Sequence, residues 1–218
     1  MFFNDEVHKK DECMKKGDFS NLANDYTKYR PSYNMAVVDA LLRATNKFAD
    51  KVVAADVGAG TGIFTKCLLS GGVTNMVAVE PNDDMRREGE VFLGNEVTFL
   101  GGSGEHTLLE SNKYDLVTMA SSFHWPNTHD ALKEFDRILN DKGIFAALWN
   151  PRLTERSESE SKVQDLLSNK YKLKSRVSSG MSGITENLRD ILLESGIFRS
   201  VLYIDSIDIV KRTHEEYM

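Results

Sequence analysis

The chain has 218 residues, of which 41 % are apolar, so it is long enough to bury the core of one α/β domain and is not typical of a disordered protein. No stretch of about eighteen apolar residues is present and the N-terminus is charged, so neither a membrane span nor export is expected. The net charge of −6 argues against a nucleic-acid partner, and two cysteines, Cys13 and Cys67, fit a reducing cytoplasm.

Strands and helices are predicted to alternate along most of the chain. An amphipathic helix is expected at 35–44, and further helices at 62–70, 82–93, around 132–139 and at 184–196. Strands are expected at 51–57, 75–80, 96–102, 114–122 and 143–149, and two adjacent, antiparallel strands at 198–205 and 207–212. This order predicts an α/β fold, a doubly wound, Rossmann-like sheet of seven mostly parallel strands with an antiparallel last strand.

Two segments lie outside the predicted core. Residues 1–48 precede the first strand and are interpreted as an N-terminal helical cover segment, and residues 49–218 are interpreted as the core. Residues 151–182, which include the polar run "TERSESESK", are an insertion within this core. Insertions at the carboxyl edge of such a sheet can cover a substrate, although a plain surface loop and helix fit the pattern equally well.

The stretch "ADVGAGTG" at 55–62 places three glycines at the first strand-to-helix turn, where backbone N–H groups face a ligand. A phosphate loop would need Lys and Ser/Thr after the last glycine, but Ile63 and Phe64 stand there. The spacing G-x-G-x-G is also one residue tighter than the dinucleotide fingerprint. Glu80, at the end of the second predicted strand, can accept hydrogen bonds from both ribose hydroxyls. The pattern therefore favours a ribonucleoside with a compact group at the glycines.

Several motifs in a fixed order resemble a known family. They are "VVAADVGAGTGIFT", "VAVEPNDDM", "FLGGSGEHTLL", "YDLVTMASSFHW" and "LKEFDRILNDKGIFAALWN". Together they resemble the class I S-adenosylmethionine-dependent methyltransferases, over residues 19–150 with a weaker likeness to 210. Within that class the chain is most similar to the small-molecule branch that includes the ubiquinone-biosynthesis and trans-aconitate methyltransferases. The resemblance implies S-adenosylmethionine as cofactor and S-adenosylhomocysteine as product.

The resemblance also implies which residues bind the cofactor. The glycine loop would hold the methionine part, Glu80 the ribose, and the region of Pro81 and Met85 the adenine. The implied cofactor residues are Tyr29, Arg30, Asp56, Gly58, Ala59, Gly60, Thr61, Gly62, Glu80, Pro81, Met85, Ser103, Gly104, Glu105, Ala120 and Ser121. Ser103 departs from the family pattern, because relatives often carry aspartate there, and a serine accepts a weaker, uncharged hydrogen bond.

The methyl acceptor would lie at the carboxyl edge of the sheet. His124 in "SSFHWPN" is the candidate catalytic base, while the alternative is a histidine that only hydrogen-bonds a neighbouring loop. An acceptor that is already ionised, such as a carboxylate, would need no base. Tyr26, Tyr33, Phe123 and Trp125 are the candidate substrate contacts. Tyr26 and Tyr29 could instead be packing aromatics and Arg30 a surface charge, although cofactor contact is favoured for Arg30, because an anionic carboxylate suits a bidentate cation. No Cys/His/Asp cluster has metal-ligand spacing, so no metal is expected.

The sequence thus predicts a cytoplasmic methyltransferase, monomeric or homodimeric, whose partner is a small-molecule methyl acceptor, most readily methylated at oxygen. Two alternatives remain open. The first is a nicotinamide-dependent oxidoreductase, and the second is a non-catalytic S-adenosylmethionine-binding partner subunit. A nucleic-acid methyltransferase is disfavoured, because Ser121 and Ser122 stand where amino-directed enzymes carry an Asn/Asp-Pro-Pro-aromatic run.

Overall fold

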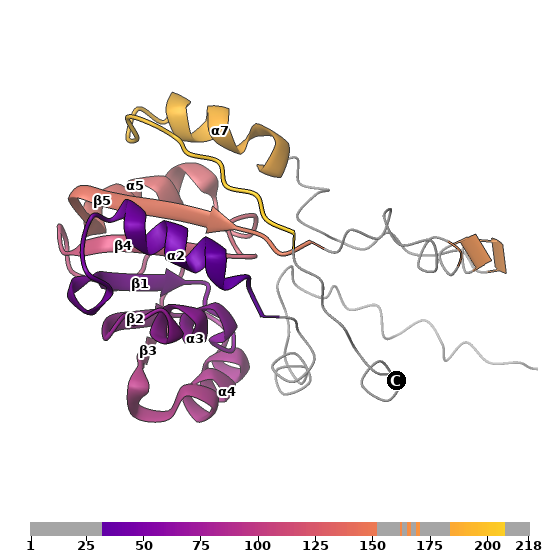
Figure 1. The fold of residues 1–218 in the computed structure, drawn as a ribbon, viewed down its shortest axis with the longest axis horizontal. Helices are drawn as coiled ribbons and strands as arrows, with labels where there is room; N and C mark the ends of the chain where they lie inside the picture. Colours follow the sequence, from indigo (N-terminus) through magenta and orange to yellow (C-terminus); the bar gives the residue numbers. More distant parts are fainter. Residues whose placement is uncertain (1–31, 152–161, 163–164, 167–168, 171–183, 208–218) are drawn as a thin grey trace, which may run out of the picture.

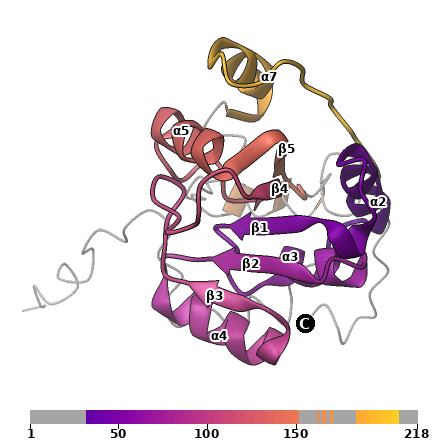
Figure 2. The same ribbon diagram turned by 90° about the vertical axis from the view of Figure 1, so that its left-hand side faces the viewer.

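A computed structural model describes residues 32–151, 162, 165–166, 169–170 and 184–207. Its centre is a sheet of five parallel strands in the order β3-β2-β1-β4-β5 (Figures 1 and 2). The strands are β1 Val53–Val57, β2 Asn75–Val79, β3 Thr98–Leu100, β4 Tyr114–Ala120 and β5 Leu139–Leu148. The predicted α/β architecture with a parallel sheet is therefore confirmed.

The central strands form because their residues are apolar on both faces. In β1, Ala54 packs on one side of the sheet and Ala55 on the other, and neither has exposed surface. β4 is buried along most of its length in the same way. Such continuous burial is typical of parallel strands covered by helices on both sides.

The helices begin and end where the sequence supplies caps. They are α2 Met35–Ala44, α3 Ile63–Ser70, α4 Asp83–Leu93, α5 Thr128–Ile138 and α7 Ile184–Glu194, with short 3₁₀ turns at Ala49–Lys51 and Gly94–Glu96. The side chains of Asn34, Asn82 and Asn127 each accept backbone hydrogen bonds at the start of the helix that follows. None of the described helices is long and apolar enough to cross a membrane.

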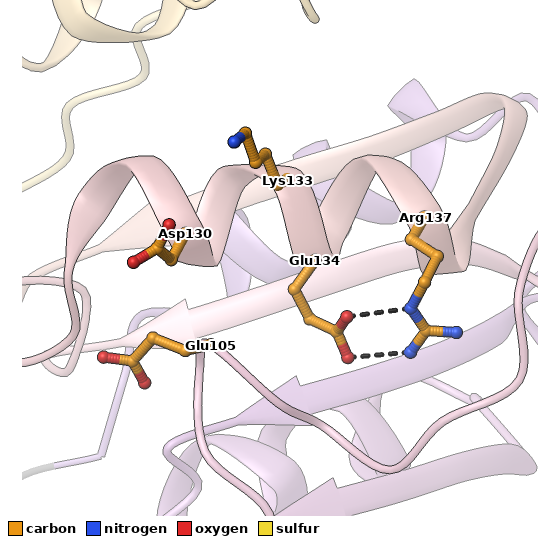
Figure 3. A pocket seen from close by; sticks show the side chains of 5 residues that line it. All are labelled: Glu105, Asp130, Lys133, Glu134 and Arg137. Carbon is orange, nitrogen blue, oxygen red and sulfur yellow. Dashed lines mark hydrogen bonds and ion pairs between the residues drawn. The ribbon is translucent and has the colours of Figure 1, made fainter.

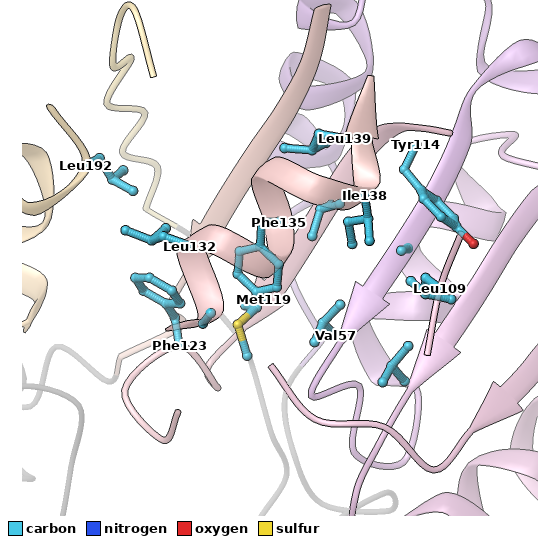
Figure 4. Close-up of a cluster of buried hydrophobic side chains, with 14 residues drawn as sticks. Val57, Leu109, Tyr114, Met119, Phe123, Leu132, Phe135, Ile138, Leu139 and Leu192 are labelled. Atoms are coloured by element: carbon cyan, nitrogen blue, oxygen red, sulfur yellow. The ribbon is translucent and has the colours of Figure 1, made fainter. Parts of the chain in front are cut away.

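Two apolar layers enclose the sheet. On one face, α5 and α7 pack on β1, β4 and β5 through a cluster that includes Phe123, Phe135, Ile138 and Leu192 (Figure 4). On the other face, α2 and α3 pack on the same strands, and α4 covers the β2–β3 end. Figures 1 and 2 show α5 and α7 grouped together, apart from α3 and α4.

The predicted sixth and seventh strands do not extend the sheet within the described residues. Residues 198–207 follow α7 and contain no strand, and residues 208–212 lie outside the described residues. Phe198 stacks on Phe145 with ring centroids 6.0 Å apart, whereas Leu202 and Tyr203 are exposed. Phe198 and Val201 therefore attach the first part of the segment to the core.

Candidate functional site

Most of the predicted site residues that the structure describes lie at one edge of the sheet. Because the five strands are parallel, the loops that follow them share the carboxyl edge. These loops carry the glycine turn at 58–62, Glu80, residues 101–105, residues 121–125 and Trp149 with Asn150. Side chains far apart in the sequence are brought together by this arrangement alone.

The glycine turn leaves β1 in left-handed backbone conformations. Gly58, Gly60 and Gly62 have φ values of 65°, 59° and 82°. A Cβ on Gly58 would lie 2.7 Å from Ser122 Cβ, and a Cβ on Gly62 would lie 2.7 Å from Leu93 Cδ1. The turn therefore needs glycine for its own conformation and packing, in addition to any ligand that approaches it.

Glu80 ties the glycine turn to the end of β2. Its Oε2 accepts from the Gly60 N–H at 2.8 Å, and its Oε1 accepts from the Asn82 N–H at 2.9 Å. Burial raises the pKa of this carboxyl group, while the two backbone N–H groups oppose that rise. A carboxylate has about four acceptor positions, so each oxygen retains capacity for a ribose hydroxyl.

Asp56 lies beneath the turn with no exposed surface. Its Oδ2 accepts from Thr65 Oγ1 at 2.6 Å, and its Oδ1 accepts from Thr118 Oγ1 at 2.8 Å. Burial, together with the nearby Glu80 charge, raises its pKa to about 6 against the opposing effect of these hydroxyls. Asp56 thus links β1, α3 and β4 directly beneath the glycine turn.

Thr61 supplies an independent sign of a ligand at the turn. Among the described residues, its buried Oγ1 has no hydrogen-bond partner. Buried hydroxyl groups are nearly always satisfied, so an isolated one points to a group that the described residues do not provide. Together with the acceptor capacity of Glu80, this polar atom fits a cofactor that combines a ribose with a short polar tail.

The residues after Glu80 differ in exposure. Met85, in the first turn of α4, is buried, and its Cε would be 3.2 Å from a Cβ placed on Gly60. Its side chain therefore packs against the glycine turn itself. Pro81 is exposed, and its predicted place beside the adenine stays a prediction.

The predicted adenine segment is a tight loop. Ser103 and His106 exchange backbone hydrogen bonds of 2.9 and 3.3 Å. A Cβ on Gly104 would lie 3.0 Å from Pro126 Cβ, so the chain passes close to the start of α5. Glu105 is exposed, and its Oε1 accepts from the Asn127 N–H at 2.8 Å.

An open hollow of about 490 Å³ beside this loop contains one predicted site residue. It is lined by Glu105, Asp130, Lys133, Glu134 and Arg137 (Figure 3). Arg137 and Glu134 form a bidentate ion pair across it, with Nε–Oε2 2.8 Å and Nη2–Oε1 2.7 Å. None of the glycine-turn residues lines the hollow, so it is distinct from the expected methionine and ribose positions.

The Glu134 carboxylate also holds the loop before β4. It accepts from the Thr107 N–H at 2.8 Å and from Thr107 Oγ1 at 2.5 Å. Despite burial, these bonds and the Arg137 guanidinium lower the pKa of Glu134 to about 2. The network was not foreseen from the sequence, because Thr107 and Glu134 meet only when α5 packs beside the loop.

Residues 32 and 33 approach the end of β4 and β5. The Tyr33 hydroxyl group lies 2.9 Å from Ser121 Oγ, and Asn150 Nδ2 donates to the Ser32 carbonyl at 2.9 Å. Ser121 follows Ala120 with φ 56°, an uncommon left-handed conformation for serine, and its N–H donates to Leu148 O at 2.7 Å. The N-terminal segment thus joins the core at the predicted site.

His124 lies between the two tryptophans of the chain. The Trp149 indole N–H donates to His124 Nδ1 at 3.5 Å, and the Trp125 ring centroid is 4.6 Å from that of His124. The imidazole is half-buried, and this desolvation lowers its pKa. Trp149 was not among the predicted site residues.

Phe123 has a different environment from the one expected. Its ring has no exposed surface and its centroid lies 6.4 Å from that of Phe135 (Figure 4). The Phe145 ring centroid is 5.0 Å away. Phe123 therefore supports the loop that carries His124, and substrate contact by its side chain would require the core to open. Trp125, by contrast, is partly exposed.

Tyr26, Tyr29 and Arg30 lie outside the described residues, so their predicted contacts stay predictions. Among the residues that the structure describes, no group of three or more histidine, cysteine, aspartate or glutamate side chains could hold a metal ion. Cys67 is a free, buried thiol, 3.2 Å from Ser32 Oγ.

The glycine turn, the acidic residue ending β2 and the β3-β2-β1-β4-β5 sheet define a class I, S-adenosylmethionine-type methyltransferase fold. Residues 55–147 match the family described as a methyltransferase domain. This match and the fold support a class I S-adenosylmethionine-dependent methyltransferase, and that family implies S-adenosylmethionine as the cofactor.

Curated relatives support the same assignment. An uncharacterized methyltransferase of Mycobacterium tuberculosis is 34 % identical over 134 residues, which cover 62 % of this chain and 52 % of that protein. An uncharacterized methyltransferase-like protein of Schizosaccharomyces pombe is 31 % identical over 130 residues, covering 59 % and 49 %. The matched part of this chain spans about half the length of these relatives.

Solved structures show the same fold. A candidate type II methyltransferase of Anaeromyxobacter dehalogenans has a TM-score of 0.56 and 23 % identity, covering 68 % of this chain and 62 % of its own. A candidate S-adenosyl-L-methionine-dependent methyltransferase of Methanococcus maripaludis has a TM-score of 0.55 and 19 % identity, covering 81 % and 82 %.

Proposed function

We propose that the protein transfers the methyl group of S-adenosylmethionine to a small-molecule acceptor, at an oxygen atom. The observation that carries the cofactor part is the Glu80 carboxylate, which two backbone N–H groups hold in place beside the glycine turn. This arrangement presents oriented acceptors to a ribose without further movement of the loop, which reduces the entropic cost of binding.

The residues of the chain would divide the work as follows. Glu80 binds the ribose hydroxyls, the turn at 58–62 faces the methionine part, and the loop at 103–105 faces the adenine. The bound cofactor supplies an electrophilic methyl group. The protein then orients an acceptor near His124 and Ser121 and excludes water, and such ordering can supply most of the acceleration.

Titration calorimetry tests the cofactor assignment. S-adenosylhomocysteine should bind the wild-type protein, and Glu80→Gln should weaken this binding by about 10- to 100-fold, because the amide has one oxygen and cannot serve both N–H groups and the ribose. Asp83→Asn is the matched control, since Asp83 is an exposed carboxylate on the same segment, paired with Arg86. Tighter binding of NAD than of S-adenosylhomocysteine would favour the oxidoreductase instead.

Methyl transfer from labelled S-adenosylmethionine to a metabolite panel tests the activity separately. Binding without transfer to any carboxylate, hydroxyl or amine in the panel would favour a non-catalytic partner subunit. The cytoplasmic location and the monomeric or homodimeric state stay predictions that fractionation and light scattering can test.

The N-terminal segment is proposed as a cover. Ser32 and Tyr33, the first described residues, contact Asn150 and Ser121 at the carboxyl edge, which supports a cover role for the N-terminal segment. A wall that opens would release the product and close during transfer. Amide hydrogen exchange in residues 1–34 should slow when S-adenosylhomocysteine is added, while β1 and β4 change little. Unchanged exchange in this segment would contradict the proposal and indicate that residues 151–182 form the cover instead.

The two outer strands stay part of the proposal. β5 is the last strand of the described sheet, and the apolar side chains of Leu202, Tyr203 and Ile207, which follow α7, are exposed. We propose that residues 198–212 pair beyond β5 as two strands, the last one antiparallel. Protected amides at 199–205 in hydrogen exchange would support the pairing, and fully exposed amides would contradict it.

A further inference from the structure

The environment of His124 indicates what the imidazole can do. An indole N–H can only donate a hydrogen bond, so the Trp149 Nε1 contact of 3.5 Å requires an unprotonated Nδ1 on His124. The opposite tautomer would place two N–H hydrogens against each other. In the neutral ring the proton is therefore on Nε2, and the only ring lone pair is already occupied by Trp149.

This arrangement is a consequence of the sheet. Ala120 pairs with Leu148 at the ends of β4 and β5, so the loop with His124 and the end of β5 with Trp149 leave the sheet side by side. Trp149 packs on the hydrophobic core, and Phe123, the neighbour of His124, is buried in the same core. Packing on the core therefore restrains both Trp149 and the loop that carries His124. The Trp125 ring also lies against the imidazole.

We propose that Trp149 is a positioning residue that holds His124 as the neutral Nε2–H tautomer, so that His124 donates a hydrogen bond to the methyl acceptor and does not act as a base. The inference rests on the proposed methyltransferase function. It predicts an acceptor whose reacting oxygen is ionised before it binds, that is, a carboxylate. During transfer an oxygen lone pair forms the new O–CH₃ bond as the S–CH₃ bond breaks, and no proton is released.

The half-buried position of the ring agrees with this role, since desolvation favours the neutral imidazole. None of the described residues forms a hydrogen bond with His124 Nε2, so its N–H group is available to a ligand. A neutral donor beside a carboxylate fixes one oxygen and leaves the other as the nucleophile.

The tautomer is measurable without cofactor or acceptor. Long-range ¹H–¹⁵N correlation spectra of the ¹⁵N-labelled protein distinguish the two neutral forms, and His124→Gln identifies the signals of His124. Near pH 7.5 we expect an unprotonated Nδ1 in the wild type and a mixture of tautomers in Trp149→Phe. Trp125→Phe is the control, because it keeps an aromatic ring against His124 and leaves the Trp149 bond intact. A wild-type Nδ1–H form, or no change in Trp149→Phe, would overturn the proposal.

Activity variants give a second, independent readout. The amide nitrogen of glutamine can replace the Nε2–H donor but not a ring base, so transfer to a carboxylate should fall less than about 10-fold in His124→Gln. His124→Ala should fall by about 100-fold or more, because the donor is lost. Equal losses in both variants, or release of one proton per methyl transferred in a weakly buffered indicator assay, would show that His124 is a base. Calorimetry with S-adenosylhomocysteine on each variant separates these outcomes from a failure to bind cofactor.

Discussion

Replacing the Glu134 carboxylate should reveal how much the loop before β4 depends on one ion pair. In Glu134→Gln, a single amide oxygen must serve Thr107 and Arg137, and the amide NH₂ group then faces another donor. The carboxyl pKa of about 2, compared with 4.5 in the unfolded chain, corresponds to about 3 kcal/mol of stability near pH 7. We therefore expect this variant to lose about 3 kcal/mol of unfolding free energy in urea at pH 7.

The pH dependence provides the sharper test. Because the folded pKa is lowered, the contribution is complete well above pH 4.5 and is lost as the pH falls toward 2. At pH 3 the difference between wild type and variant should have fallen to about 1.4 kcal/mol, roughly half. Glu110→Gln is the matched control, because Glu110 also pairs with a cation three residues away but is 76 % exposed. Equal losses in both variants, or a difference independent of pH, would refute the reasoning.

Three further predictions concern the glycine turn. Asp56→Asn should stabilise the ligand-free protein by up to about 3 kcal/mol at pH 7, since the raised pKa of about 6 makes the charged form costly, and the gain should vanish below pH 4; urea titrations at both pH values test this. Gly58→Ala should destabilise more than Gly196→Ala in thermal unfolding, because both have positive φ but only Gly58 has Ser122 within 2.7 Å of the added Cβ. Thr61→Val should leave Tm unchanged or higher yet weaken S-adenosylhomocysteine binding in calorimetry, and unchanged binding would make the isolated hydroxyl irrelevant.

The sheet and its helices were predictable because their signals are local. The strands expected at 51–57 and 114–122 correspond to β1 and β4, and the helix expected at 82–93 corresponds to α4, which the Asn82 side chain caps. β5 begins at Leu139, earlier than expected, because Leu139 pairs with Tyr114, and the register then shifts across the polar residues that follow before Ile144 pairs with Leu116. The hydrophobicity of a segment does not reveal where a strand begins when its first residue is defined by pairing with a neighbouring strand.

The site residues were predictable where a residue type at a given position has few possible roles. They were less predictable where packing decides which way a side chain points. A carboxylate ending β2 beside a glycine turn is specific, and Glu80 does contact Gly60. Phe123, one residue before His124, turns into the core, and no sequence pattern separates that orientation from a pocket wall. Trp149 reaches His124 only through the pairing of β4 with β5, which is a long-range consequence of the fold.

Electrostatics at the glycine turn bears on the choice between the two cofactor classes. Asp56 and Glu80 are both buried there, both carboxyl pKa values are raised by burial, and the charge of Glu80 raises that of Asp56. Adding the doubly negative pyrophosphate of a dinucleotide would increase this repulsion, whereas a sulfonium and an ammonium group would reduce it. The glycine turn is therefore unfavourable for a dinucleotide in two ways: its spacing is one residue tighter than the fingerprint, and the buried carboxylates beside it would repel a pyrophosphate. The two arguments are independent, because one rests on backbone spacing and the other on charge.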